Sequence, residues 1–191
     1  MSATGWWLVA LAVALVLGWY LSYSAGRLDR LHHKVESSRA ALDAQLVRRA
    51  AATVEVAQLL DPVTGLLLAD AASRALSAGE EDQPGPDRDP LTVPPYLEEA
   101  ENDLSRALYL ALDDSDAVAQ LQGEPMTADA LAVLAQACTR VQLARRFHND
   151  AVAQALRVRR KRVVRWARLA GHAPLPQMIE IGDALPPALT R

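Results

Sequence analysis

The sequence predicts an all-α protein in which an N-terminal transmembrane helix continues into an antiparallel, up-down-up-down four-helix bundle. An uncharged apolar run near the N-terminus is the first observation behind this prediction. Apolar side chains then recur at steps of three and four residues along four further segments, as on the inward face of amphipathic helices. Only nine of the 191 residues are aromatic, whereas Ala and Leu abound, a composition that suits helix packing better than sheets.

The first predicted element is a membrane anchor over residues 1–26. The nineteen residues from Gly5 to Tyr23 carry no charge, and at about 1.5 Å per residue a helix of that length nearly covers the ~30 Å hydrocarbon layer. A cleaved signal peptide would have a basic stretch ahead of the apolar run, and residues 1–4 have no charged side chain, so a retained anchor is favoured. Amphipathic aromatic rings, which prefer the two headgroup layers, stand at both ends of the run: Trp6, Trp7, Trp19, Tyr20 and Tyr23.

Basic residues directly after the anchor predict its orientation. Arg27, Arg30 and Lys34 follow the apolar run, and the positive-inside rule places such a segment in the cytoplasm. We therefore expect a single-pass protein of the cell membrane, with its N-terminus outside and the bulk of the chain cytoplasmic.

The predicted bundle covers residues 27–170, and its first two helices have clear boundaries. No Pro or Gly interrupts the chain between Gly26 and Pro62, so one helix should run from the membrane to about Leu60. Asp61 and Pro62 suit the cap and first turn of a second helix, which should end near Ala78–Gly79.

The other two helices follow an acidic break. The third is expected from about Pro95 to Leu112, and residues 113–125 form a second break with room for a short turn. Thr127 suits the cap of the fourth helix, which should reach about Ala170. Residues 171–191 are left as a C-terminal tail. Since short breaks between long helices favour antiparallel neighbours, the end of the fourth helix should return to the membrane.

Residues 79–95 are rich in Pro and acidic side chains, which predicts a flexible loop. The net charge of −3 also hides unlike blocks, because residues 61–116 carry −11 and residues 117–170 carry +7. One hypothesis is therefore a latch, in which acidic residues of the loop fold onto the basic part of the fourth helix: Glu80, Glu81, Asp82, Asp87 and Asp89.

The strongest local signal is a cluster of seven cations near the end of the fourth helix. It has three main interpretations: a solvated helix face, contact with anionic lipid headgroups, worth about 1 kcal/mol per basic residue near the surface, or the latch. Nucleic-acid binding is least favoured, because stacking aromatic residues are missing and the chain is acidic overall. The seven residues are Arg157, Arg159, Arg160, Lys161, Arg162, Arg165 and Arg168.

Metal and catalytic motifs are not apparent, so we expect no metal, no cofactor and no catalytic residues. A single cysteine, Cys138, excludes a disulfide framework and thiolate metal sites, and it should be a small buried residue. His32 and His33 are adjacent and point about 100° apart on a helix, while His148 lies on the apolar stripe as a packing histidine. Neither a nucleophile elbow nor a phosphate-binding glycine loop occurs.

Several strings, together with the single N-terminal span, resemble the LemA family of bacterial membrane proteins. They are LDRLHHKVESSRAALDAQLVRRAA at 28–51, EAENDLSRAL at 99–108 and ARRFHNDAV at 144–152. In the last string the family usually has two tyrosines where this chain has Phe147 and His148. The resemblance covers nearly the whole chain and implies a helical-bundle domain on one membrane span, with no established catalytic chemistry.

The residues of these strings suggest a polar cluster near the middle of the bundle. Arg145, Arg146, Asn149 and Asp150 occupy about one helical turn and could cross to Arg48 and Arg49, locking the register of the helices. The two arginine pairs are also expected to face acidic residues of the third helix, namely Glu98, Glu99, Glu101 and Asp103.

The function that these features favour is a membrane-anchored scaffold or interaction protein at the cytoplasmic face of a bacterial membrane, without catalysis. Its expected partners are the lipid bilayer, anionic headgroups and a protein that the sequence does not identify. The first alternative is a regulatory module that transmits a change through the anchor helix. An enzyme or a nucleic-acid binder is the less favoured alternative.

Overall fold

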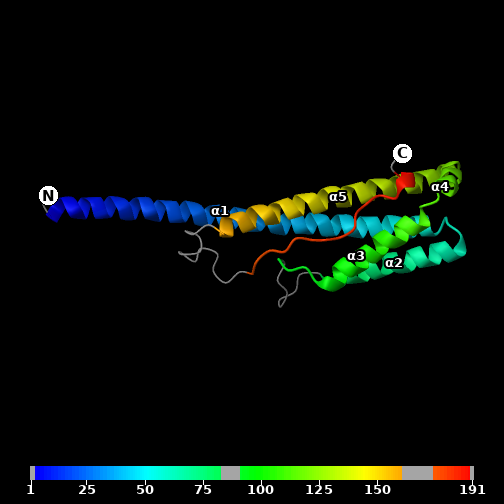
Figure 1. Ribbon diagram of the computed structural model, residues 1–191, viewed down its shortest axis with the longest axis horizontal. Coiled ribbons are helices and arrows are strands. Elements are labelled where there is room, and N and C mark those ends of the chain that lie inside the picture. Colours follow the sequence, from blue (N-terminus) through cyan, green and yellow to red (C-terminus); the bar gives the residue numbers. More distant parts are fainter. Residues whose placement is uncertain (1–2, 83–90, 161–173, 190–191) are drawn as a thin grey trace.

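A computed structural model describes residues 3–82, 91–160 and 174–189 of the chain (Figure 1). These residues contain only helices as regular elements, which confirms the all-α prediction at the level of fold class. The elements are α1 (Ala3–Ala57), α2 (Pro62–Glu81), α3 (Pro95–Ala111), α4 (Ser115–Gln122), α5 (Pro125–Arg159) and a final 3-10 turn, η1 (Pro187–Leu189).

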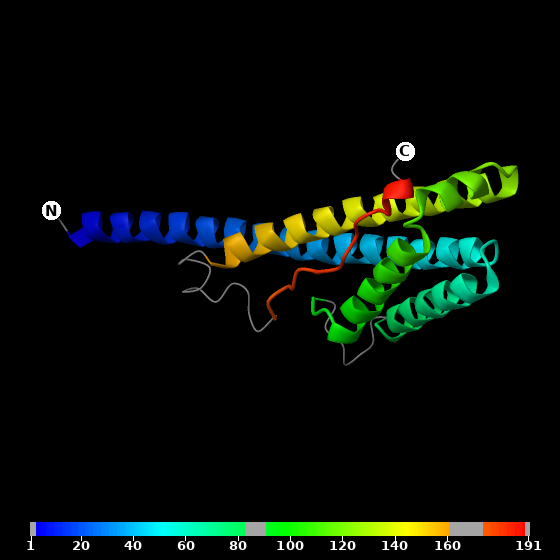
Figure 2. The same ribbon diagram turned by 45° about the vertical axis from the view of Figure 1, so that its right-hand side comes forward.

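The two longest helices determine the shape of the molecule. α1 has 55 residues, about 80 Å at the usual helical rise, and its N-terminal part projects beyond all other elements (Figures 1 and 2). α5 runs antiparallel along the other part of α1, and α1 packs more extensively against α5 than against any other helix of the described chain. At the end of this pair Val158 packs against Leu28, so the last turn of α5 lies level with the start of the buried part of α1. The predicted return of the last long helix along the first is confirmed.

α1 and α2 form a tight hairpin whose signals were correctly identified in the sequence. The Asp61 carboxylate accepts hydrogen bonds from the backbone N–H groups of Val63 and Thr64, both at 3.1 Å, and Pro62 occupies the first turn of α2. Gly65 is buried at the closest approach, because a Cβ atom there would lie 2.3 Å from the Ala57 carbonyl oxygen. The hairpin therefore depends on a glycine at this position.

We expect Gly65→Ala to destabilise the fold by about 1–3 kcal/mol, because the added methyl group forces two backbones apart. Gly79 lies in the same helix and is the matched control, since a Cβ there meets nothing within 4 Å. Gly79→Ala should be neutral or stabilising by up to about 1 kcal/mol through helix propensity. Urea unfolding of both variants measures the difference, and equal stability would show that the close approach at Gly65 is unimportant.

Several helix boundaries differ from the sequence prediction, and the first is the end of α1 at Ala57 instead of about Leu60. α2 continues past Gly79 to Glu81, and the suggested short turn is the eight-residue helix α4, capped by Asp114. α5 begins at Pro125 rather than after Thr127, because a proline lacks the N–H group that the first helical turn leaves unpaired. α5 is described to Arg159, and the predicted continuation to Ala170 lies outside the described residues.

The predicted antiparallel four-helix bundle is not confirmed, because the C-terminal segment separates α3 from α5 over part of their length. α2 packs on α1 and α3 packs on α2, but α3 and α5 diverge toward the end from which α1 projects. Residues 174–189 run between them, antiparallel to α5 (Figure 2), and we call the space that they fill the α3–α5 groove. Far from being a loose tail, this segment contributes the buried side chains Ile179, Ile181, Ala188 and Leu189.

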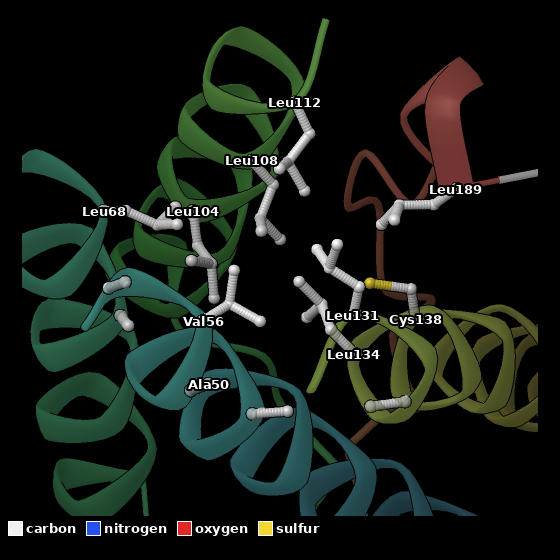
Figure 3. Close-up of a cluster of buried hydrophobic side chains, with 14 of the residues drawn as sticks. Ala50, Val56, Leu68, Leu104, Leu108, Leu112, Leu131, Leu134, Cys138 and Leu189 are labelled. Atoms are coloured by element: carbon white, nitrogen blue, oxygen red, sulfur yellow. The ribbon is translucent and has the colours of Figure 1, made fainter. Parts of the chain in front are cut away.

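The main core lies at the end of the molecule distant from the projecting part of α1. Figure 3 shows Leu104 and Leu108 of α3 meeting Leu131 and Leu134 of α5, with Val56 of α1 between them. Cys138 is buried in the same cluster, as predicted, and burial raises the pKa of its thiol. This core holds α3 and α5 together only at one end, which leaves the other end for the C-terminal segment.

Candidate functional site

The projecting part of α1 exposes a continuous apolar surface. It includes a window with a mean hydropathy of 1.8, long and apolar enough to cross a membrane, and none of that window is buried. Its large exposed side chains include Trp6 and Trp7 near one end and Trp19 and Tyr23 near the other. A surface of this size in water would strongly favour association, so it requires a cover of lipid or protein.

The basic end of α5 lies beside the C-terminal end of this apolar surface. Arg157 and Arg160 are exposed, and the Arg159 guanidinium donates a hydrogen bond to the Pro174 carbonyl oxygen. Because Val158 packs on Leu28, these three cations lie within a few residues of the apolar run. The other four residues of the predicted cluster, Lys161, Arg162, Arg165 and Arg168, lie outside the described residues.

The acidic loop makes one contact that bears on the predicted latch. The Asp82 carboxylate forms an ion pair with Arg39 of α1, which also pairs with Asp43 at 2.9 Å. Both side chains of the Arg39–Asp82 pair are at least 90% buried. Asp82 is thus directed toward α1, while Glu80 and Glu81 are exposed. Asp87 and Asp89, like the predicted flexibility of residues 83–90, lie outside the described residues.

Arg49 is the most buried cation of the described chain. Its guanidinium forms an ion pair with Glu101 of α3, and both side chains are only 2% exposed. It also donates hydrogen bonds to the Ser105 hydroxyl at 3.1 Å and to the Glu101 carbonyl oxygen at 3.3 Å. Glu101 is one of the four acidic residues expected to face the arginine pairs. The contact joins α1 to α3 in the interior, where either charge would destabilise the fold if the other were removed.

Arg145 and Asn149 of α5 bind the C-terminal segment instead of crossing to α1. Arg145 forms two hydrogen bonds with the Asp183 carboxylate, at 2.7 and 3.0 Å. The Asn149 amide donates to the Ile179 carbonyl oxygen at 3.0 Å and accepts from the Ile179 N–H at 2.9 Å. The expectation that Arg145 faces an acidic residue of the third helix is therefore wrong, because its acidic partner lies in the C-terminal segment.

The six residues of the predicted polar cluster are not brought together. Within the described part of the chain, no side-chain hydrogen bond or ion pair joins any two of them. Arg49 and Arg145 contact different partners as above, and three of the six are exposed to solvent: Arg48, Arg146 and Asp150.

On the α3 side of the α3–α5 groove, Glu98 binds the C-terminal segment and not an arginine as expected, and the sequence analysis does not single out Asn102 or Ser105 as contact residues. Glu98 accepts a hydrogen bond from the Glu180 N–H at 2.7 Å, and Asn102 accepts one from the Gly182 N–H at 2.6 Å. Ser105 donates to the Gly182 carbonyl oxygen. The signal that could have revealed them is the spacing of four and then three residues, which places three polar side chains on one stripe of a helix.

His148 is buried beneath the C-terminal segment, as predicted for a packing histidine. Its ring nitrogens lie 3.3 Å from the Ser38 hydroxyl and 3.4 Å from the Gln177 carbonyl oxygen. Burial lowers the pKa of His148, and the charge of nearby Arg39 lowers it further. The neutral imidazole is therefore the form that the folded protein holds.

This burial predicts that the protein loses stability as the pH falls below about 6.5, the ordinary pKa of histidine. The unfolded chain takes up a proton there that folded His148 does not, so the free energy of unfolding decreases by up to about 1.4 kcal/mol per pH unit. His148→Gln should flatten this slope between pH 7 and 5.5. Chemical unfolding at several pH values measures it, and identical slopes for both proteins would contradict the assignment.

A cavity of about 250 Å³ lies between α1, α2 and α3, lined mostly by small apolar side chains. Asp43, Asp82 and Glu101 contribute its polar atoms, and burial raises the pKa of Asp43. All three carboxylates pair with buried arginines, Asp43 and Asp82 with Arg39 and Glu101 with Arg49, so the cavity offers a ligand little free charge.

Among the described residues, no group of three or more His, Cys, Asp or Glu side chains is placed to hold a metal ion. Comparisons of the chain with models of protein families, with curated proteins and with solved structures find no match.

Proposed function

We propose that the protein is a membrane-anchored helical scaffold at the cytoplasmic face of a bacterial membrane, of the kind that the resemblance to the LemA family implies, and that it acts without catalysis. The observation that carries the proposal is the continuity of α1. One helix presents an apolar surface over its first part and then forms the core of the helical domain, without a break between the two. The domain is thus rigidly fixed to its anchor.

The position of the basic end of α5 supports contact with anionic headgroups. Arg157 and Arg160 are exposed beside Leu28, just after the apolar run ends. Cations so close to a bilayer surface attract anionic lipids. Such contact would limit the tilt of the helical domain and hold its distant end at a constant height of about 50 Å, the length of α5.

Extraction from membranes tests the anchor. The full chain should stay in the membrane pellet at alkaline pH, whereas Leu11→Arg combined with Leu15→Arg should release it, because each arginine costs about 2.5–3.5 kcal/mol at the centre of a spanning helix. Leu66 and Leu67 of α2 are also exposed, and arginine at both positions is the matched control that should stay in the pellet. Release of the unmodified chain, or retention of the Leu11/Leu15 variant, would refute the proposal.

A further inference from the structure

Side chains that line the groove between α3 and α5 bind the backbone of residues 179–183. Asn149 pairs with both the N–H and the carbonyl group of Ile179, as a neighbouring β-strand would. Asn102 and Ser105 pair with the N–H and the carbonyl group of Gly182 from the opposite wall. Gln142 donates to the Asp183 carbonyl oxygen. Side chains of two helices thus pair with the backbone of residues 179–183, whereas the Gln177 N–H donates to the Leu91 carbonyl oxygen at 3.0 Å.

The same groove selects side chains at alternate positions of the segment. Ile179 and Ile181 are buried in a cluster with Leu42, Leu46 and Val141, while Glu180 between them is exposed. A Cβ at Gly182 would lie 3.4 Å from the Asn102 side-chain oxygen, so a small residue suits that position. Arg145 then binds the Asp183 carboxylate with two hydrogen bonds.

This division of labour is characteristic of peptide recognition, in which main-chain hydrogen bonds provide affinity and pockets for alternate side chains provide specificity. Five polar side chains of α3 and α5 pair with backbone groups of residues 179–183, so these hydrogen bonds do not depend on the side chains of the bound segment: Glu98, Asn102, Ser105, Gln142 and Asn149. The described contacts depend on little of the segment's own sequence beyond two apolar residues, a small residue and an aspartate.

We propose that the α3–α5 groove is a binding site for extended peptide segments of the pattern apolar-x-apolar-small-Asp, which the chain's own residues 174–189 occupy when no partner does. The partner is a protein that presents such a segment. This deepens the proposed scaffold function by naming the chemistry of its partner. Because a tethered segment competes at an effective concentration in the millimolar range, a partner must match the same contacts or be concentrated at the membrane.

The test uses the full chain in detergent micelles and a fluorescent peptide with the sequence of residues 174–189. Asp183→Arg places a cation against Arg145 and should weaken the resident segment, so the variant should bind the peptide at least tenfold more tightly than the unmodified chain does. Arg145→Asp should reverse the preference and favour a peptide that carries Asp183→Arg. A scrambled peptide is the control, and circular dichroism verifies that each variant keeps its helices.

The unmodified chain supplies a second measurement that does not depend on any variant. Millimolar peptide should displace the resident segment and speed hydrogen exchange at the amides of Ile179 and Gly182, whereas the scrambled peptide should not. The proposal is overturned if the peptide neither binds folded Asp183→Arg protein nor displaces the resident segment, or if the scrambled peptide binds equally. The peptide experiment is carried out in micelles, so a negative result would not contradict the membrane anchor. In the same way, release of the chain from membranes would not contradict peptide binding in the groove.

Discussion

Arg49→Met is expected to lower the free energy of unfolding by about 3–5 kcal/mol, the largest effect of any single substitution considered for this chain. The variant removes the cation but leaves the Glu101 carboxylate 98% buried between α1 and α3. It also deprives the Ser105 hydroxyl of a donor at 3.1 Å. An unpaired carboxylate at such a position must take up a proton or be solvated by water that enters the interior, and either outcome lowers the free energy of unfolding.

Two further variants distinguish the effect of an unpaired buried charge from a simple loss of packing. Arg49→Met combined with Glu101→Met removes both charges and should recover most of the lost stability, because well-packed apolar residues replace a buried ion pair at little cost. Arg48→Met is the exposed neighbour and should change the free energy of unfolding by no more than about 0.5 kcal/mol. A double variant as unstable as Arg49→Met alone would contradict the role given to the charge.

The second large effect is expected for Asn149→Leu, at about 2 kcal/mol. Leucine preserves the volume of the side chain but cannot pair with the N–H and carbonyl groups of Ile179, which Asn149 contacts at 2.9 and 3.0 Å. Two partly buried backbone groups lose their partners, and each such loss costs about 1 kcal/mol or more. Part of this cost should be relieved by local release of the C-terminal segment.

Thermal unfolding and hydrogen exchange together check this prediction. The melting temperature should fall, and the Ile179 amide should exchange much faster, while amides of the α1–α2 hairpin change little. Asp150→Ala, at the adjacent exposed position, is the control that should leave both measurements unchanged. Uniform loss of protection throughout the protein would mean that Asn149 supports the whole fold and not the docking of one segment.

The fold could be predicted from the sequence where local chemistry decides it. The Asp61–Pro62 signal placed the α1–α2 hairpin correctly, because a cap and a first-turn proline act within a few residues. The predicted start of α5 is too late, since the sequence suggests Thr127 as a cap and Pro125 as part of the preceding break, whereas Pro125 occupies the first turn. Both residues suit a helix start, so the packing around them decides which one begins α5.

The C-terminal segment could not be predicted in this way, because its position depends on a gap that only the tertiary structure creates. Its prolines and short apolar pairs predict neither a helix nor a strand. Asn149 was singled out in the sequence, but its partner is a backbone group thirty residues away. Likewise, the acidic stripe of α3 was expected to meet arginines, yet the sequence does not tell that Glu101 faces inward while Glu98 binds the segment.

The distance of each end of α5 from the bilayer tests the central claim most directly. Arg160→Cys and Met126→Cys, each in a full chain with Cys138→Ala, place a fluorophore at the two ends of α5 in vesicles that contain anionic lipid and a headgroup quencher. The structure predicts strong quenching at position 160 and almost none at position 126, about 50 Å farther along the helix. Equal quenching at both positions, or stronger quenching at 126, would contradict a helical domain that stands upright on its anchor.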